Sequence, residues 1–261
     1  MKTRKIGQNG PQVGVVGYGA MSFSDFYGPA TDEGSMGILD ACVELGVTHI
    51  DTSNVYGMGR SETVIGDWLK KRGGENPFHI ASKVGITRDP GQRLNNEPHR
   101  MRQSLEESLT RLGVDAIDLY YVHRRDVRFE IEEVTQTMAD FVKEGKVKAI
   151  GYSEIAPSSL RRAHAVHPIA AVQSEYSLST RAPELGLNQT CAELGATMVA
   201  FSPVGRSLLT DRPLPLDVCK ELGWVKDNPR FQEPNYSANM AYNAKFRELA
   251  ADMGTSAAAL A

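Results

Sequence analysis

The stretch VTHIDTSNVYGMG, which runs from Val47 to Gly59, is the most informative part of the chain about the fold. Its first half, Val47 to Ser53, is a short β-rich run with the apolar content of a strand buried on both faces of a parallel sheet. Polar side chains begin at the end of this run with Asp51, and glycines follow. A helical pattern then begins, with Ser61 as its expected N-cap. A strand, a polar strand end and a helix in this order predict one βα unit.

The same order repeats along the chain, with about 25 to 40 residues between successive strands, as expected for βα units joined by right-handed crossovers. Further strands are predicted at Val13 to Gly19, Phe78 to Val84, Ala116 to His123, Lys146 to Ser153 and Thr197 to Pro203, and in the first half of the run from Ala170 to Tyr176. Helices are predicted at about Thr31 to Gly46, Ser61 to Gly73, Pro98 to Leu112, Glu130 to Glu144, Ser158 to His167, Leu187 to Leu194 and Met240 to Met253.

Two α/β architectures fit this repeat, an open doubly wound sheet and a closed barrel. An open dinucleotide-binding sheet usually has a G-x-G-x-x-G turn after its first strand, but here Gly17 and Gly19 are followed by AMSF. Polar residues stand instead at the ends of many strands, where a barrel builds its active site: Asp51, Lys83, His123, Ser153, Gln173 and Ser202. We therefore predict a (β/α)8 TIM barrel.

The composition fits one domain. The chain has 261 residues, 41% of them hydrophobic and 23% charged, with a formal net charge of −3. A barrel of this kind takes roughly 250 residues as a single domain. The charge balance argues against nucleic acid as a partner, and without a run of about 18 apolar residues no membrane partner is expected. Three widely spaced cysteines indicate reduced thiols and a cytoplasmic protein. The Pro- and Arg-rich stretch from Gly205 to Pro234 is expected to be a long functional loop.

Four residues at or just after strand ends form a chemically coherent set: Asp51, Tyr56, Lys83 and His123. A lysine ammonium near a phenol favours its ionised form and makes it a better proton donor, and a carboxylate keeps a buried lysine charged. His123 would hydrogen-bond a substrate oxygen and place it against Tyr56. Taken singly, each has a plainer interpretation: a structural histidine, a turn aspartate, a loop tyrosine or a solvated lysine. Only their joint position favours an active site.

These residues lie in stretches that resemble the aldo-keto reductase family, in the branch of pyridoxal reductase-like and auxin-induced-protein-like members. The matching stretches are GYGAMSFSDFYGPAT, THIDTSNVYGMGRSE, ASKVG, RLGVDAIDLYYVHRRD, GKVKAIGYSE, AVQSEYSLSTR and AFSPVGRSLLT, which follow the family's order from near residue 12 to the end of the chain. The resemblance implies a TIM barrel that uses NADP(H) to reduce the carbonyl of a small aldehyde or ketone to an alcohol, without a metal. It assigns Tyr56 as the proton donor, Lys83 and Asp51 as its tuning pair, and His123 as the residue that orients the carbonyl.

The resemblance also implies cofactor contacts. Ser153 and Gln173 would bond the nicotinamide carboxamide, Phe201 would stack on the ring in place of the usual Tyr or Trp, and Asp51 would adjoin the cofactor. The nicotinamide end would lie over Gly19, Ala20 and Met21, where small residues allow close approach. A cofactor loop at about 202–235 would wrap the pyrophosphate through Ser202, Pro203, Val204, Gly205, Arg206, Ser207, Leu208 and Arg212. The plainer alternative for this segment is a solvated surface loop that bears arginines.

A substrate pocket lined by aromatic residues would suit carbonyl compounds with an apolar group. Its candidate residues are Met21, Phe23, Phe26, Tyr27, Tyr56, His123 and Trp224. Most of these side chains could equally be core or loop packing.

Two other functions remain open from the sequence. One is a cofactor-binding regulatory protein that resembles potassium-channel β subunits, although those proteins have Asn at the position of His123. The other is a barrel aldolase in which Lys83 would form a Schiff base. The sequence does not indicate an oligomeric state.

The predicted strands number one fewer than a closed barrel needs. The tail AYNAKFRELAADMGTSAAALA holds one helix and the start of another near Ser256, so the chain is expected to end before strand 8. An open barrel exposes two strand edges, and weakened cofactor affinity and stability are therefore expected.

Overall fold

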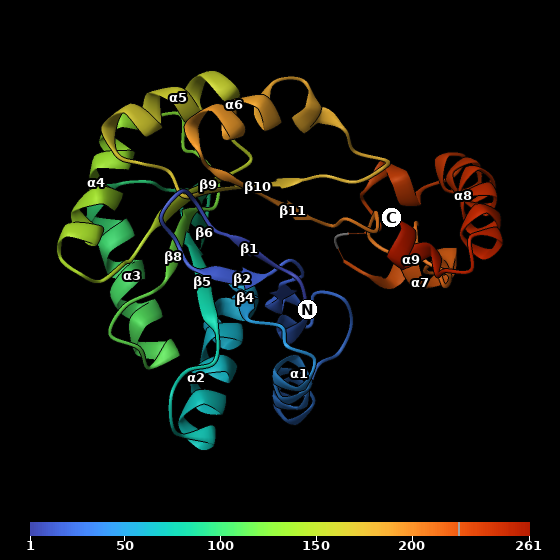
Figure 1. Cartoon of the computed structure of the whole chain (residues 1–261), viewed down its shortest axis with the longest axis horizontal. Coiled ribbons are helices and arrows are strands. Elements are labelled where there is room, and N and C mark those ends of the chain that lie inside the picture. Colours follow the sequence, from blue (N-terminus) through green and yellow to red (C-terminus); the bar gives the residue numbers. More distant parts are fainter. Residues whose placement is uncertain (224) are drawn as a thin grey trace. The chain divides into compact units, whose positions relative to one another are not determined.

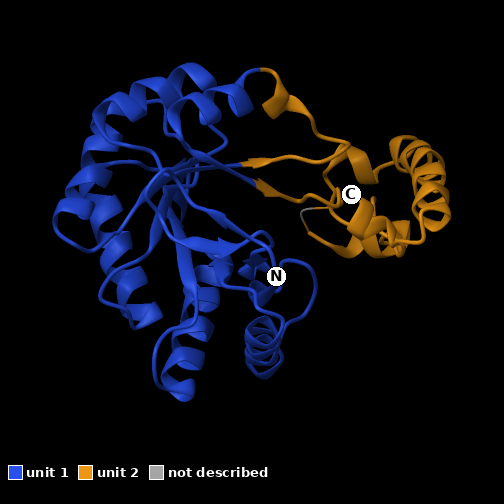
Figure 2. Cartoon of the chain, viewed as in Figure 1, with its two compact units in different colours: residues 1–173, 186–199 blue, residues 174–185, 200–261 orange. Residues whose placement is uncertain are grey.

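The structure is a computed structural model that describes residues 1–223 and 225–261. It divides into two compact units (Figure 2). Unit 1 comprises residues 1–173 and 186–199, and unit 2 comprises residues 174–185 and 200–261.

A seven-stranded sheet runs through the described residues in the order β11-β10-β9-β8-β5-β4-β3. The neighbours from β3 to β10 are parallel. The strands are β3 (Tyr18–Gly19), β4 (His49–Asp51), β5 (His79–Val84), β8 (Leu119–Val122), β9 (Ile150–Ser153), β10 (Ala171–Glu175) and β11 (Thr197–Phe201). All but β10 lie within a predicted strand, and β10 continues to Glu175, past the first half of its run in which the strand was predicted. The parallel pairing predicted for the series is confirmed from β3 to β10.

Helices follow the strands and, in Figure 1, α2 to α5 lie around the outside of them. The helices of unit 1 are α1 (Asp32–Glu44), α2 (Arg60–Arg72), α3 (Pro98–Leu112), α4 (Ile131–Lys143), α5 (Pro157–Val166) and α6 (Leu187–Leu194). Thr31 caps α1 by accepting a hydrogen bond from the Gly34 amide, and the left-handed Gly113 and Gly195 end α3 and α6. The bounds predicted for α3 and α6 are confirmed.

The core has one layer on each face of the sheet, as alternation along β8 shows. Tyr120 and Val122 belong to the large cluster that includes the helix side chains, whereas Leu119 and Tyr121 belong to a smaller cluster with Ala81. All four residues of β8 are fully buried. Burial on both faces is what the continuous apolar runs in the sequence indicate.

The start of the chain differs from the prediction. Only Tyr18–Gly19 of the predicted strand Val13 to Gly19 joins the parallel sheet. Val13 and Gly14 belong to β2 (Gln12–Gly14), which forms an antiparallel hairpin with β1 (Thr3–Lys5). An apolar run alone could not show this break. A second hairpin, β6 (Ile86–Asp89) with β7 (Gln92–Leu94), was not predicted because its strands are short and polar.

The prediction of Ser61 as the N-cap of α2 was also wrong. Helix α2 begins at Arg60 after the left-handed Gly59, and the Ser61 hydroxyl donates instead to the Ala20 carbonyl at 2.8 Å. The hydroxyls of Ser61 and Thr52 lie 2.8 Å apart. Ser61 therefore ties the start of α2 to the segments after β3 and β4.

Unit 2 has a small core of its own, made of Leu208, Cys219, Val225, Phe231 and Tyr236. Its helices are η3 (Ala182–Glu184), α7 (Leu216–Glu221), η4 (Pro229–Phe231), α8 (Asn235–Asp252) and α9 (Ala257–Leu260). The stretch from Gly205 to Pro234 is therefore not irregular throughout, because α7 and η4 lie within it. Across residues 1–223 and 225–261, no helix combines the length and apolar character needed to cross a membrane.

Candidate active site

The carboxyl ends of the parallel strands bring the candidate residues of unit 1 together. Gly19 pairs with Asp51 between β3 and β4, and Ser153 pairs with Gln173 between β9 and β10. Lys83 lies one residue before the end of β5, and His123 directly follows β8. The His123 amide donates to the Val84 carbonyl at 2.7 Å, which fixes the start of the loop after β8. The residues thus converge on the edge where a barrel places its chemistry.

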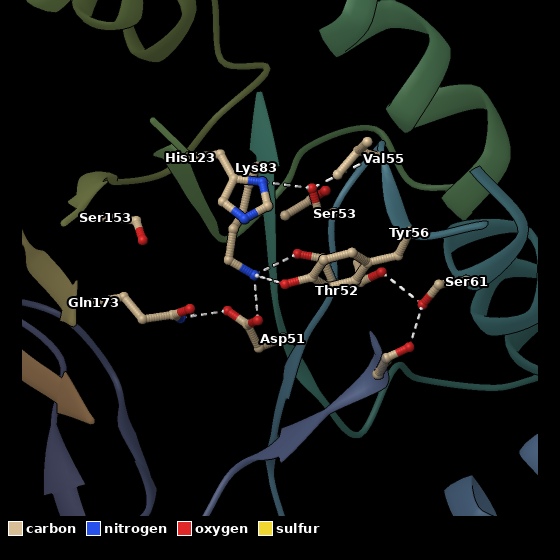
Figure 3. Close-up of polar contacts among 12 residues, drawn as sticks. Asp51, Thr52, Ser53, Val55, Tyr56, Ser61, Lys83, His123, Ser153 and Gln173 are labelled. Atoms are coloured by element: carbon tan, nitrogen blue, oxygen red, sulfur yellow. Dashed lines mark hydrogen bonds and ion pairs between the residues drawn. The ribbon is translucent and has the colours of Figure 1, made fainter. Parts of the chain in front are cut away.

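Lys83 is the centre of this group (Figure 3). Its side chain is fully buried, and its Nζ forms an ion pair with Asp51 Oδ1. The same ammonium donates to the Thr52 carbonyl at 2.8 Å and to the Tyr56 hydroxyl at 3.3 Å. Burial lowers the pKa of Lys83, but Asp51 and Tyr56 more than offset it, so the pKa lies above the usual value. Lys83 is therefore a buried cation whose ammonium has three oxygen partners.

Tyr56 begins η2 (Tyr56–Gly59), a turn with an unusual backbone. Gly57, Met58 and Gly59 all have left-handed φ values, of 58°, 56° and 94°. This turn reverses the chain between β4 and α2 and leaves the Tyr56 hydroxyl on Lys83. Burial raises the pKa of Tyr56, and the Lys83 ammonium lowers it, as the sequence predicts. The effect of burial is larger, so the pKa of Tyr56 lies above its usual value. The phenol therefore keeps its proton near neutral pH and can donate it.

His123 lies against Tyr56 with its ring nearly perpendicular, at 5.8 Å between centroids and 82° between planes. Its Nδ1 is 3.1 Å from the hydroxyl of Ser53. Burial lowers the pKa of His123 well below its usual value, and the cations Lys83 and Arg124 lower it further. The imidazole is therefore neutral near pH 7.

Two residues predicted to bind nicotinamide have protein partners in this structure. Gln173 donates its side-chain amide to Asp51 Oδ2 at 2.7 Å. Arg124 Nη1 donates to the Ser153 hydroxyl at 2.8 Å and to the His123 carbonyl at 2.6 Å. Arg124 and Ser53 were not among the predicted site residues. The signal for both was proximity in sequence, since Arg124 follows His123 and Ser53 lies between Asp51 and Tyr56.

The other predicted residues of unit 1 lie in or near η1 (Ala20–Ser24). A side chain added at Gly19 would meet no atom within 4 Å, so space is open above this glycine. Phe23 is fully buried in the main core, with its ring 5.5 Å from that of Tyr18. Phe26 and Tyr27 stack edge to face after η1, with centroids 5.1 Å apart. Met21 is half-buried, and Trp224 lies outside the described residues.

The predicted cofactor loop begins where β11 ends, in unit 2. Ser202, Gly205, Arg206 and Ser207 all have left-handed φ values, between 52° and 82°. The turn is held by a hydrogen bond from the Gly205 amide to the Ser202 carbonyl at 2.9 Å, and Ser207 Oγ accepts from the Leu214 amide at 3.0 Å. Strained backbone of this kind is concentrated at functional sites. The residues predicted to contact the pyrophosphate in this loop are Ser202, Pro203, Val204, Gly205, Arg206, Ser207, Leu208 and Arg212. Phe201, predicted to stack on the nicotinamide ring, ends β11 directly before them.

Comparison with known proteins identifies the family. The family model described as "Aldo/keto reductase family" matches residues 15–261. The chain belongs to the aldo/keto reductase family. Among curated relatives, the reductase yakc of Schizosaccharomyces pombe, whose name carries NADP(+), is 38% identical over 95% of this chain and 74% of its own. The aldo-keto reductase str7 of Strobilurus tenacellus is 41% identical over 95% of this chain and 75% of its own.

Solved structures of aldo/keto reductases and related enzymes share the fold. The glycerol dehydrogenase of Gluconobacter oxydans matches 98% of this chain and 79% of its own with a TM-score of 0.83 and 27% identity. A Bacillus halodurans aldo-keto reductase in its holo form matches 82% of this chain and 70% of its own, with a TM-score of 0.73 and 29% identity. The predicted family and its (β/α)8 barrel class are therefore confirmed.

Proposed function

We propose that this aldo/keto reductase is an alcohol-forming carbonyl reductase that takes NADPH as its reductant and Tyr56 as its general acid. The observation that carries the proposal is the chain of contacts from half-buried Asp51 through fully buried Lys83 to the Tyr56 hydroxyl. Family membership and the NADP(+) in the name of the Schizosaccharomyces pombe relative support the cofactor.

The residues present fit a nicotinamide. The space above Gly19 is open to a flat ring, and the polar side chains of Gln173 and Ser153 stand at the neighbouring strand ends. The left-handed backbone between Ser202 and Ser207 is a suitable turn around a pyrophosphate, with Arg206 and Arg212 as the cations that would pair with its oxygens. When bound, the cofactor supplies a hydride from its nicotinamide C4 to the carbonyl carbon.

The side chains of unit 1 then control the proton. Tyr56 donates its phenolic proton to the carbonyl oxygen as negative charge develops there. Lys83 stabilises the phenolate left behind, because its ammonium is already within hydrogen-bond distance of the phenol oxygen. Asp51 keeps Lys83 charged in a fully buried position. His123, neutral and adjacent to the Tyr56 ring, donates a hydrogen bond that orients the carbonyl.

The proposed substrate is a small aldehyde or ketone with an apolar or aromatic group. Phe26, Tyr27 and Met21 are the described aromatic and apolar side chains near η1 that would contact that group. We also propose a cytoplasmic location, since Cys42, Cys191 and Cys219 are all free thiols.

The proposal is tested by following loss of NADPH absorbance with a panel of aldehydes. Tyr56→Phe removes only the acidic hydroxyl, and a positioned acid contributes about 10² to 10⁴ in rate, so kcat should fall by that factor. NADPH affinity, measured by fluorescence titration, should stay within about twofold. Turnover of the folded variant at the wild-type rate would overturn the assignment, and cofactor binding without turnover of any carbonyl in the wild type would favour the regulatory alternative.

A further inference from the structure

Ser53 occupies an unusual place in the active-site loop. It is fully buried, and its hydroxyl faces His123 rather than the Lys83 centre, at 3.1 Å from Nδ1. Figure 3 shows the imidazole with this nitrogen turned to Ser53 and its other nitrogen turned away from it. The partner on Nδ1 is therefore a side chain of this chain, and Nε2 is the nitrogen left for another group.

The identity of that partner determines the tautomer of the ring. A neutral imidazole carries one N–H and one bare nitrogen, and the hydrogen bond at one nitrogen sets the state of the other. His123 is neutral because burial and two nearby cations, Lys83 and Arg124, oppose its protonation. Its two nitrogens consequently differ, and only one of them can donate to a carbonyl oxygen.

The Ser53 hydroxyl has a single proton and two acceptors within reach. Nδ1 of His123 is at 3.1 Å, and Oδ1 of Asn54 is at 3.4 Å. The Val55 amide donates to the same oxygen from 3.5 Å, so a lone pair of the hydroxyl already has a donor. The shorter distance favours a hydroxyl that donates to Nδ1, and the Val55 amide, which uses one of the two lone pairs, does not compete for that proton.

We propose that Ser53 is a positioning residue that holds His123 in the tautomer protonated at Nε2, by donating its hydroxyl proton to Nδ1. In this tautomer Nε2–H is a donor for the substrate oxygen. In the opposite tautomer, the lone pair of Nε2 would face a lone pair of the substrate carbonyl oxygen, and the two would repel each other. The inference rests on the proposed function only for the statement that the substrate oxygen is the group that Nε2 meets.

The tautomer can be measured without activity. In a two-bond ¹H–¹⁵N correlation spectrum of the ¹⁵N-labelled wild-type chain at neutral pH, we expect His123 Nδ1 to resonate as an unprotonated nitrogen and Nε2 as a protonated one. Loss of these signals in His123→Asn assigns them. A protonated Nδ1 in the wild type would overturn the proposal, whatever the reaction catalysed.

Variants of Ser53 then separate positioning from structure. Ser53→Ala should lower kcat by about three- to tenfold, as expected for loss of one neutral hydrogen bond, with little change in NADPH affinity. The His123 spectrum should shift toward a mixture of tautomers. Ser53→Thr keeps the hydroxyl and should restore the wild-type tautomer and most of the rate. Ser35→Ala is the matched control, since Ser35 is also a buried serine but lies on α1 and donates to the carbonyl of Thr31, the N-cap of that helix.

The outcomes distinguish the two proposals. If Ser53→Ala keeps both the tautomer and kcat of the wild type, Ser53 does not position His123. If instead His123→Asn and Tyr56→Phe both retain wild-type turnover, the proposed function fails. The tautomer proposed for His123 is then still decided by the wild-type spectrum alone.

Discussion

Gln173 Nε2 lies 2.7 Å from Asp51 Oδ2, whereas Lys83 binds the other oxygen of the same carboxylate, Oδ1. Both oxygens of Asp51 therefore have a donor, one from β10 and one from β5. Because Gln173 is also proposed to bind the nicotinamide, this side chain would link cofactor binding to the Asp51–Lys83–Tyr56 chain.

Replacing Gln173 tests this link. In Gln173→Leu we expect kcat/KM to fall by about tenfold, since one hydrogen bond to a buried-site carboxylate is lost. In Gln173→Glu a second carboxylate faces Asp51. The two carboxylates can share a proton at low pH, but they repel each other once that proton is lost at higher pH. The variant should therefore lose more activity as the pH rises, relative to wild type. Parallel pH profiles of kcat/KM for the two proteins would contradict the link.

Removal of the buried cation should reduce both stability and activity. Lys83→Met leaves the Asp51 carboxylate without its ion-pair partner, and breaking a buried pair from one side costs about 3 to 5 kcal/mol of unfolding free energy. Tyr56 loses the ammonium that stabilises its phenolate form, so kcat should also fall. Lys148→Met is the matched control, because Lys148 is 65% exposed and pairs with Asp118 at the surface. It should cost under about 1 kcal/mol in urea unfolding. Equal losses in the two variants would show that burial is not the cause.

The pair of histidines His49 and His79 should make stability depend on pH. Their Nδ1 atoms are 3.0 Å apart at the starts of β4 and β5. Burial, with the neighbouring His49, lowers the pKa of His79 to about 4. Between about pH 6.5 and 4 the unfolded chain therefore binds a proton that the folded chain does not, so stability falls as the pH falls.

For His79 alone, the expected loss of unfolding free energy between pH 7 and pH 5 is about 2 kcal/mol. His79→Gln can still hydrogen-bond His49 but does not titrate, so its loss over the same interval should be smaller. Denaturant titrations of both proteins at the two pH values measure the difference. An unchanged pH dependence in His79→Gln would rule out His79 as the source.

Two glycines in helices should respond oppositely to alanine. A methyl group at Gly66 of α2 would lie 2.1 Å from the Arg111 carbonyl of α3, so Gly66→Ala should destabilise the fold by about 1 to 3 kcal/mol or more. At Gly37 of α1 the same methyl group would meet nothing within 4 Å. Gly37→Ala should therefore stabilise the protein by about 0.5 to 1 kcal/mol through helix propensity. Thermal unfolding of both variants checks the sign of each change.

The sequence predicts the fold well where periodicity is strong. The bounds of α3 and α6 match those of the structure, since Pro98 and Gly113 mark the ends of α3 and Gly195 ends α6. The length of the first strand was overestimated because the apolar run from Val13 begins in β2, the second strand of the hairpin with β1, and only its end joins the parallel sheet. Ser61 was predicted to be a cap because a serine at the start of a helical pattern usually is one. Its actual hydrogen-bond partner, the Ala20 carbonyl, is distant in sequence and could not be inferred.

The candidate site shows a similar limit. Asp51, Lys83, Tyr56 and His123 each stand at a strand end or in its loop, and topology alone brings such positions together. The hydrogen bond from Gln173 to Asp51 crosses 122 positions of sequence, and burial of Tyr56 outweighs the effect of Lys83 on its pKa. Neither the pairing nor the balance of these two effects follows from residue order.

The proposed acid–base residues all lie within the first 173 residues, whereas the proposed pyrophosphate turn lies between Ser202 and Arg212, in a unit with its own hydrophobic core. Changes in how the cofactor pyrophosphate is held can therefore arise in one segment of the gene without altering the codons for proton transfer. A library that varies only 202–212 is therefore the natural starting point for altering cofactor affinity while keeping the proton-transfer residues.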